Sequence, residues 1–182
     1  TLTARRARAG EQLHTLDDSN RIAVGDELVI ADSEKPAGLA GIMGGLDSEV
    51  TDQTTTVVLE AASFHGPTIR RTARRIGLRS EASGRFERGV DETATIRAVT
   101  RAAQLLTEMD ACTVAEGTID VNPAPRVPTV LTFSARAVAE RIGANIPGEW
   151  MASALRSLGF IVEEQGVETY RVVVPSWRGD VT

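Results

Sequence analysis

The chain has 182 residues, of which 42% are hydrophobic and 25% charged, and its net charge is −5. This composition supports the core of one large domain or two small ones, and it argues against nucleic-acid binding through a positive field of the whole molecule. No apolar run approaches the roughly 18 residues of a membrane span, and the first residues do not read as a signal peptide. Cys112 is the only cysteine, so no internal disulfide can form and an intracellular protein is expected.

In chain order, residues 1–31 predict short strands and turns. The glycine-rich segment GLAGIMGG, residues 38–45, predicts a connection between strands. Residues 56–61, TVVLEA, are rich in β-branched and apolar side chains, which predicts a short buried strand. A helix with Pro67 in its first turn and Gly77 just past its end follows. A second helix is expected after Asp91, which is a suitable N-cap.

The second part of the chain begins after a segment with three prolines between residues 121 and 129, a composition typical of a linker. A strand is expected at residues 130–133, and then a helix from an N-cap at Ser134 to Gly143. Another helix runs from Pro147 to Leu158, and two strands occupy residues 160–164 and 170–174. Two helices and a hairpin suggest a winged-helix layout. The second helix carries a single arginine, so packing is favoured over reading a DNA groove.

Two groups of residues are candidates for a ligand site, and each has a plainer interpretation. The glycine cluster lacks the GxGxxG and Walker patterns, so it either forms a turn or lets the bare N–H groups of Gly44 and Gly45 approach a ligand. Glu60 ends the predicted strand, either exposed to solvent or turned into a polar pocket. His14, His65 and Cys112 have no partner that suggests catalysis, and no histidine–cysteine cluster suggests zinc.

The helix after Glu60 has an arginine face. Ile69, Ala73 and Ile76 share one side at helical spacing. The other side is either a solvated face or a surface that meets phosphate oxygens. Lys35 is the only lysine among the 20 basic residues, and a GC-rich genome is the plain explanation of this bias. The arginines of the face are Arg70, Arg71, Arg74 and Arg75.

Several separated strings agree with one family. AGIMGG, VVLEAASF, RRTARRIGLRSEASGRFERGVD and PSWRGD follow one another in the chain. In this order they resemble the beta chain of bacterial phenylalanyl-tRNA synthetase, over nearly all 182 residues. The resemblance implies an internal fragment with an α/β (α+β) editing-domain-like fold over residues 1–122. A Pro-rich linker at 123–128 and the first part of a small α+β, winged-helix-like domain at 129–182 follow.

The resemblance also implies a function. The editing domain of this family hydrolyses tyrosine wrongly attached to the phenylalanine tRNA, because a pocket shaped for phenylalanine rejects an added hydroxyl only modestly. Glu60 matches the carboxylate that accepts the tyrosine hydroxyl, and Gly44 and Gly45 match glycines beside the bound amino acid. Ser80 and Ala82 match pocket-lining positions. The arginine face is then expected near the tRNA 3′ end, and a positioned water is expected to attack the ester.

Partners and cofactors follow from the same resemblance. The parent enzyme is expected to be a cytoplasmic heterotetramer of two alpha and two beta chains that charges tRNA(Phe) using ATP and Mg²⁺, with the ATP site on the alpha chain. Asp180 matches one ligand of a magnesium site, but a single carboxylate is too few, so no metal or other cofactor is expected in this fragment. Part of the family's pocket lies upstream of residue 1, so the isolated fragment is expected to be inactive. The alternative is a non-catalytic module that binds an amino acid or RNA, or serves as a scaffold.

Overall fold

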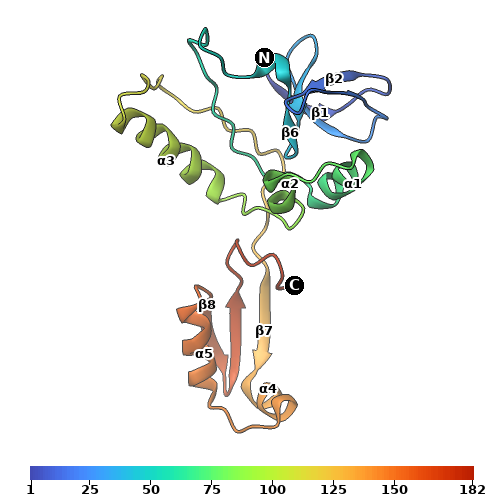
Figure 1. Cartoon of the computed structure of the whole chain (residues 1–182). Coiled ribbons are helices and arrows are strands. Elements are labelled where there is room, and N and C mark those ends of the chain that lie inside the picture. Colours follow the sequence, from blue (N-terminus) through green and yellow to red (C-terminus); the bar gives the residue numbers. More distant parts are fainter. The chain divides into compact units, whose positions relative to one another are not determined.

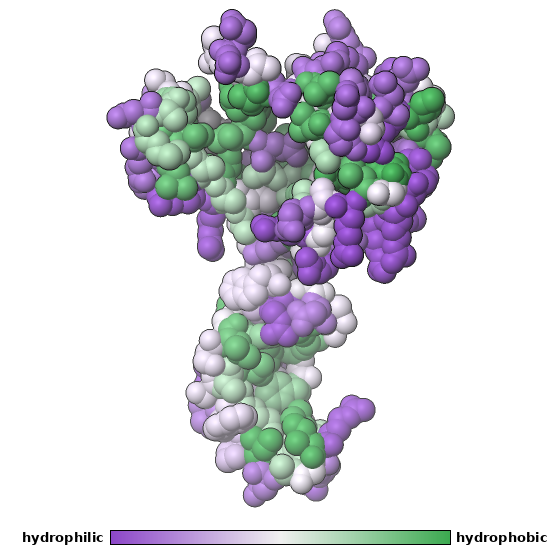
Figure 2. Space-filling view, in the orientation of Figure 1, coloured by the Kyte–Doolittle hydropathy of each residue, from purple (hydrophilic) through white to green (hydrophobic).

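The computed structural model describes residues 1–182, which divide into two compact units, Thr1–Val114 and Ala115–Thr182. The first unit contains the strands and helices coloured blue to yellow-green in Figure 1, and the second contains a smaller sheet with two helices. Apolar side chains reach the surface of both units among polar ones (Figure 2). No helix combines the length and the apolar character needed to cross a membrane.

The first unit is built on a four-stranded antiparallel sheet in the order β1-β4-β5-β6. Val29 and Leu39 face each other across β4 and β5, and both are buried in the core. A separate two-stranded hairpin, β2-β3, packs beside this sheet. The strands are β1 Thr3–Arg6, β2 Gln12–Thr15, β3 Ser19–Ile22, β4 Leu28–Ala31, β5 Pro36–Leu39 and β6 Met43–Gly44.

The glycine-rich segment is part of this sheet, so its prediction as a mere connection is wrong. Residues 36–44 form the hairpin of β5 and β6. Gly41 lies at its turn with φ +66°, and a Cβ there would stand 3.0 Å from the ring of Phe86. Backbone conformation and packing therefore both favour glycine at this position. The glycine-rich composition by itself does not reveal that the segment forms a hairpin.

An ion pair near the start of the chain is expected to make the first unit sensitive to acid. Glu11 accepts both guanidinium N–H groups of Arg5, at 2.6 and 2.9 Å, and the pair lowers the pKa of Glu11 from 4.5 to about 2. A lowered pKa means that the stabilisation is complete above the unfolded value and is lost as pH falls from 4.5 towards 2. Urea unfolding of the wild type and Glu11→Gln should therefore differ at pH 7 and converge near pH 2. A difference that does not change with pH would contradict this.

Helix α1, Gly66–Ile76, confirms the prediction from Pro67 and Gly77. Gly77 ends the helix in the left-handed conformation at φ 68°. His65 is the N-cap residue, and its Nδ1 lies 2.9 Å from the hydroxyl of Thr68. The apolar side of the helix, including Ile69 at 1% exposed, packs on the sheet core. The caps and the apolar stripe are local features, which is why the sequence reveals this helix.

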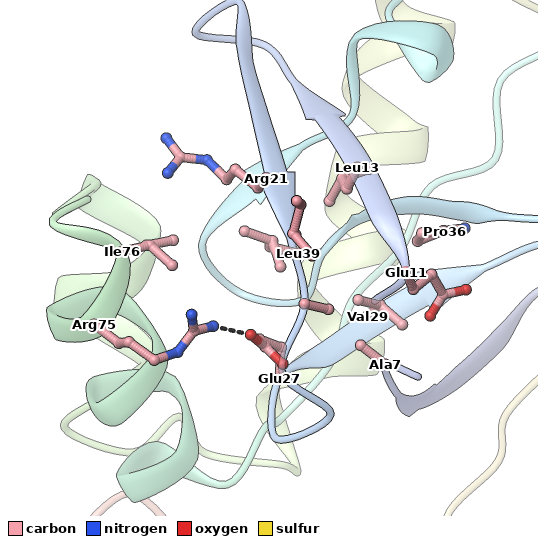
Figure 3. A pocket seen from close by; sticks show the side chains of 12 residues that line it. Ala7, Glu11, Leu13, Arg21, Glu27, Val29, Pro36, Leu39, Arg75 and Ile76 are labelled. Atoms are coloured by element: carbon pink, nitrogen blue, oxygen red, sulfur yellow. Dashed lines mark ion pairs between the residues drawn. The ribbon is translucent and has the colours of Figure 1, made fainter. Parts of the chain in front are cut away.

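A buried carboxylate anchors α1 to the sheet. Glu27 is 1% exposed and accepts backbone N–H groups from Val24, Gly25 and Asp26 at 3.0–3.2 Å. Its remaining partner is the guanidinium of Arg75 on α1, which points towards it across the β3–β4 turn (Figure 3). A cavity of about 20 Å³ beside this pair has room for little more than one water.

The strand predicted at residues 56–61 is not formed. This segment is extended but belongs to no sheet, and its residues are exposed. Val57 is 55% exposed and Val58 is 71% exposed. Composition favours a strand here, but a strand exists only when another strand supplies its hydrogen bonds. The prediction of a buried strand is therefore wrong for residues 1–182.

Two further helices complete the first unit. Ser80 caps the short α2, Glu81–Phe86, by accepting the N–H of Ser83 at 3.1 Å. Helix α3, Ala94–Glu108, has Thr93 rather than the predicted Asp91 as its N-cap residue, and the Asp91 carboxylate accepts the N–H of Thr93 at 3.0 Å. Helix α3 has no buried residue, and Figure 1 shows it lying apart from the strands. Its apolar stripe is only partly covered in residues 1–182: Val99, Ala103 and Leu106 are half-buried, and Ile96 is exposed.

The second unit has a three-stranded antiparallel sheet in the order β7-β9-β8 with two helices packed on it. Ser134 caps α4 and Gly143 ends it, as predicted. Tyr170 and Val172 of the central strand are buried against Ala152 of α5. This is a mixed α and β unit with the predicted element order. The elements are β7 Val130–Ser134, α4 Ala135–Ile142, α5 Gly148–Ser157, β8 Ile161–Gly166 and β9 Thr169–Val173.

Candidate functional site

The first unit contains an open cavity of about 520 Å³ between the β4-β5-β6 sheet and the extended segment before α1. Gly44, Glu60 and Ala82 all line it, so three positions that lie far apart in the sequence meet at one cavity. The rest of the lining is mostly apolar, with Glu49 as the only other charged residue. Volumes of about 300–1,000 Å³ are usual for small-molecule sites.

Glu60 is one of the two carboxylates that line this cavity. It makes no hydrogen bond or ion pair within the chain. Glu60 is exposed to solvent, but the surrounding protein desolvates it in part, and this raises its pKa above 4.5 because desolvation disfavours the charged form. A donor that enters the cavity would restore part of the lost solvation. No basic residue lines the cavity, so Glu49 and Glu60 make it suitable for hydroxyl and ammonium donors rather than anions.

Ser80 lies beside the cavity but its hydroxyl is already engaged. Its Oγ donates to the carbonyl of Ile42 at 2.6 Å and accepts the N–H of Ser83 at 3.1 Å. These bonds tie the start of α2 to the residue before β6. Ser80 therefore holds Ala82 against the cavity and offers no free hydroxyl to a ligand there.

Gly44 and Gly45 are glycines for different reasons. A Cβ on Gly45 would stand 2.6 Å from the carbonyl oxygen of Ala37 on β5, whereas one on Gly44 would meet the movable end of Leu16 at 3.1 Å. Gly44 lines the large cavity, and Gly45 lines a smaller polar cleft with His14 and Lys35. The backbone contact explains Gly45 without a ligand.

Alanine substitutions should separate these two glycines. Gly45→Ala is expected to destabilise the first unit by about 1–3 kcal/mol, the usual cost of forced overpacking. Gly44→Ala should cost less than about 1 kcal/mol, because Leu16 can move aside. Urea unfolding followed by far-UV circular dichroism measures both changes. Equal losses would show that the contact with Ala37 does not decide the choice of glycine.

The four arginines of α1 do not share one environment. Arg75 is paired with buried Glu27, and Arg71 lies 3.4 Å from the hydroxyl of Thr68. Arg70 and Arg74 are exposed and make no side-chain hydrogen bond or ion pair. They lie one helical turn apart, so they project from the same face. The spacing of residues in a helix cannot reveal which arginine has a distant partner.

Of the remaining candidate residues, Asp180 and His14 contact other side chains, and Cys112 is a free cysteine. Asp180 accepts two N–H groups of Arg178, each at 2.8 Å, which lowers its pKa to about 2. No group of three or more histidine, cysteine, aspartate or glutamate side chains is arranged to hold a metal. His14 contacts Asp18 at 2.9 Å, and Cys112 is exposed.

Comparison with known proteins assigns both units. A B3/4 domain family model matches residues 1–111, and a tRNA synthetase B5 domain model matches residues 131–182. A phenylalanine–tRNA ligase beta subunit from Symbiobacterium thermophilum is 47% identical over 161 residues, which cover 88% of this chain and 18% of that protein. The chain belongs to the phenylalanine–tRNA ligase beta subunit family.

Other members of the beta subunit family match along the whole chain. The protein from Shouchella clausii is 41% identical over 182 residues, which is 100% of this chain and 22% of its own length. The protein from Syntrophus aciditrophicus is 41% identical over 184 residues and 23% of its length. The chain therefore spans about a fifth of the length of these relatives.

Proposed function

We propose that the first unit is part of an editing site that hydrolyses tyrosine from mischarged tRNA(Phe), within a parent synthetase that charges this tRNA with phenylalanine. The observation that carries the proposal is the unpaired carboxylate of Glu60 in a largely apolar cavity that also contains Gly44 and Ala82. An aromatic ring suits the apolar lining. A phenolic hydroxyl supplies the donor that Glu60 lacks, and phenylalanine does not.

Selectivity in such a cavity follows from hydrogen bonding. A tyrosine ring places its O–H against Glu60, whereas a phenylalanine ring covers the carboxylate and leaves it without a donor. An unsatisfied charged group costs about 1.5–3 kcal/mol or more, which corresponds to a preference of about 10- to 150-fold for tyrosine. This is the sense of discrimination that a second sieve requires.

The ester substrate also carries an α-ammonium group. Glu49 lies in the same cavity wall and no cation lies there to neutralise it. We assign to Glu49 an electrostatic attraction for this ammonium, which tyrosyl and phenylalanyl esters share. Because aminoacyl esters are already activated, positioning of a water can provide much of the acceleration. No serine–histidine–aspartate arrangement is needed for that chemistry.

Hydrolysis of preformed esters by the parent enzyme tests the proposal. Tyr-tRNA(Phe) should be deacylated much faster than Phe-tRNA(Phe), and much faster than in buffer alone. If both esters survive equally long with and without the enzyme, editing is excluded. Binding of tyrosine without hydrolysis would instead support the alternative of a non-catalytic amino-acid-binding module. We propose that the ATP- and Mg²⁺-dependent charging reaction takes place on the alpha chain of a tetramer of two alpha and two beta chains.

We further propose that the exposed arginines of α1 contact the tRNA backbone. Arg70, Arg71 and Arg74 are solvent-accessible, whereas the charge of Arg75 is compensated by Glu27. Guanidinium groups match phosphate oxygens in geometry and charge. The contribution of this face is local, since the whole chain carries a net charge of −5.

Salt dependence should reveal these contacts in the parent enzyme. Replacing Arg70 and Arg74 by alanine together should weaken tRNA binding and reduce the slope of log K against log [KCl] by about 1–2, because each phosphate contact contributes about 0.7–0.9. Filter binding across a KCl series measures the slope. Arg136→Ala in the second unit, where Arg136 is exposed and paired with Glu140, serves as the control. An unchanged slope in the double variant would contradict the assignment.

A further inference from the structure

The extended segment before α1 has an unusual combination of composition and environment. From Thr55 to Phe64, no backbone N–H or C=O group makes a hydrogen bond within the chain. Residues 54–58 are nevertheless five consecutive β-branched residues, TTTVV, which strongly favour a strand. Chains rarely leave so many successive backbone groups without protein partners next to apolar side chains. The segment therefore has the composition of a β-strand but makes none of the backbone hydrogen bonds that pair a strand with its neighbour.

The side chains of the segment already alternate as they do in a strand. Thr54, Thr56, Val58 and Glu60 all line the large cavity, whereas Leu59 does not. A period of two is what a β-conformation imposes on successive side chains. Val57 also reaches the cavity, so the alternation is incomplete at one position.

We infer that residues 55–60 form a β-strand in the complete beta subunit, paired with a strand of the same polypeptide that lies outside residues 1–182. The matched relatives are about four to five times longer than this chain, since it covers 18–23% of them. Leu2 lines the same cavity as the segment. Residues that precede β1 in the parent chain therefore enter beside the unpaired backbone, and they are the partner that we assign.

Charge argues against a second copy as the partner. Residues 46–60 contain Asp47, Glu49, Asp52 and Glu60 and no basic residue. Pairing two such segments would place like charges close together, which destabilises a ladder. The partner strand should be neutral or basic.

Strand formation would fix the position of Glu60. In a ladder, the side-chain direction of each residue is set by register, and a shift of one residue turns every side chain to the other face. Pairing thus makes Glu60 a fixed part of the cavity wall rather than the end of an exposed segment. The inference concerns pairing alone, and it holds whether or not the cavity hydrolyses an ester.

Hydrogen exchange without any substrate tests the inference. In the 182-residue chain, the amides of residues 55–60 should exchange at nearly unprotected rates. In the full-length beta subunit, alone and in complex with the alpha chain, they should exchange at least about 100-fold more slowly, as amides of a cooperative sheet do. Equally fast exchange in all three samples would overturn the inference. Protection that requires the alpha chain, or that depends on the concentration of the 182-residue chain, would assign a different partner and overturn it as well.

A proline variant locates the pairing. In the full-length subunit, Val58→Pro removes one N–H and should abolish protection of residues 55–60 while the amides of α1 remain protected. Val58→Thr keeps the β-branched shape and the N–H, so it should retain protection. If Val58→Pro prevents folding, the comparison of the wild-type samples still decides the question.

Discussion

Glu27→Ala should destabilise the first unit by about 3–5 kcal/mol, because it leaves three backbone N–H groups without their acceptor, at about 1–3 kcal/mol each where they are buried. Glu27 is 1% exposed and satisfies three backbone N–H groups as well as the guanidinium of Arg75. Alanine leaves these donors without an acceptor and detaches α1 from the β3–β4 turn. Since small domains have only about 5–15 kcal/mol of stability, much of the unit's stability would be lost.

Graded variants show that the carboxylate itself is responsible. Arg75→Ala should cost about 1–2 kcal/mol, because Glu27 keeps its backbone donors and the Arg75 side chain is 39% exposed. Arg74→Ala, on the same helix and without a partner, should change stability by less than about 0.5 kcal/mol. If Arg74→Ala and Glu27→Ala are equally damaging, the buried pair is not the anchor of α1.

The distribution of aromatic residues provides an internal control for this experiment. Trp150, Tyr170 and Trp177 all belong to the second unit, and the first unit has no tryptophan or tyrosine. Tryptophan fluorescence therefore follows unfolding of the second unit, while far-UV circular dichroism follows both. Glu27→Ala should move the dichroism transition of the first unit to lower urea and leave the fluorescence transition unchanged.

Glu60→Ala in the parent enzyme should reduce kcat/KM for Tyr-tRNA(Phe) hydrolysis by about 10- to 150-fold, the value of one hydrogen bond to a charged group. Hydrolysis of Phe-tRNA(Phe) should change by less than about threefold, because phenylalanine makes no bond to Glu60. Glu60→Gln should be intermediate, since its amide oxygen still accepts a hydrogen bond. Charging of tRNA(Phe) with phenylalanine should be unaffected.

Glu49→Gln is the matched control for Glu60. It alters the other carboxylate of the same cavity, and it should slow hydrolysis of both esters by a similar factor because the ammonium group is common to them. If Glu49→Gln changes the preference for tyrosine and Glu60→Ala does not, the roles assigned to the two residues are reversed.

The pH dependence of editing should also reflect Glu60. Since desolvation raises the pKa of Glu60, the preference for tyrosine should decline as pH falls, beginning above the pH at which a fully solvated glutamate is protonated.

The sequence predicts α1, α3, α4 and α5 well because their boundaries are set by nearby residues, but it does not predict the short α2. Gly77 and Gly143 end their helices in the left-handed backbone conformation. Ser134 caps the helix that directly follows it. A strand forms only where a distant segment pairs with it. The glycine-rich composition of β5 and β6 therefore does not indicate that they pair, and the predicted strand at 56–61 does not form. The same limit applies to Arg75, whose partner Glu27 lies far away in the sequence.

The candidate site could be predicted only in part. From residue chemistry alone, Glu60 is compatible both with an exposed strand end and with a polar pocket. Only the family resemblance predicts that it shares a pocket with Gly44 and Ala82. The structure brings these three residues to one cavity. It also shows that the Ser80 hydroxyl is occupied by Ile42 and that Gly45 is constrained by Ala37, both of which are tertiary contacts without a local signal in the sequence.

Helix α3 has a consequence for how the first unit opens. Because none of its residues is buried, unfolding α3 exposes little additional apolar surface to water. The sheet and α1, in contrast, share the core that contains Val29 and Ile69. In residues 1–182 the unit can therefore lose α3 as a separate, low-energy step while the cavity walls stay folded, so cleavage by trypsin after Arg97 or Arg101 should precede cleavage within α1.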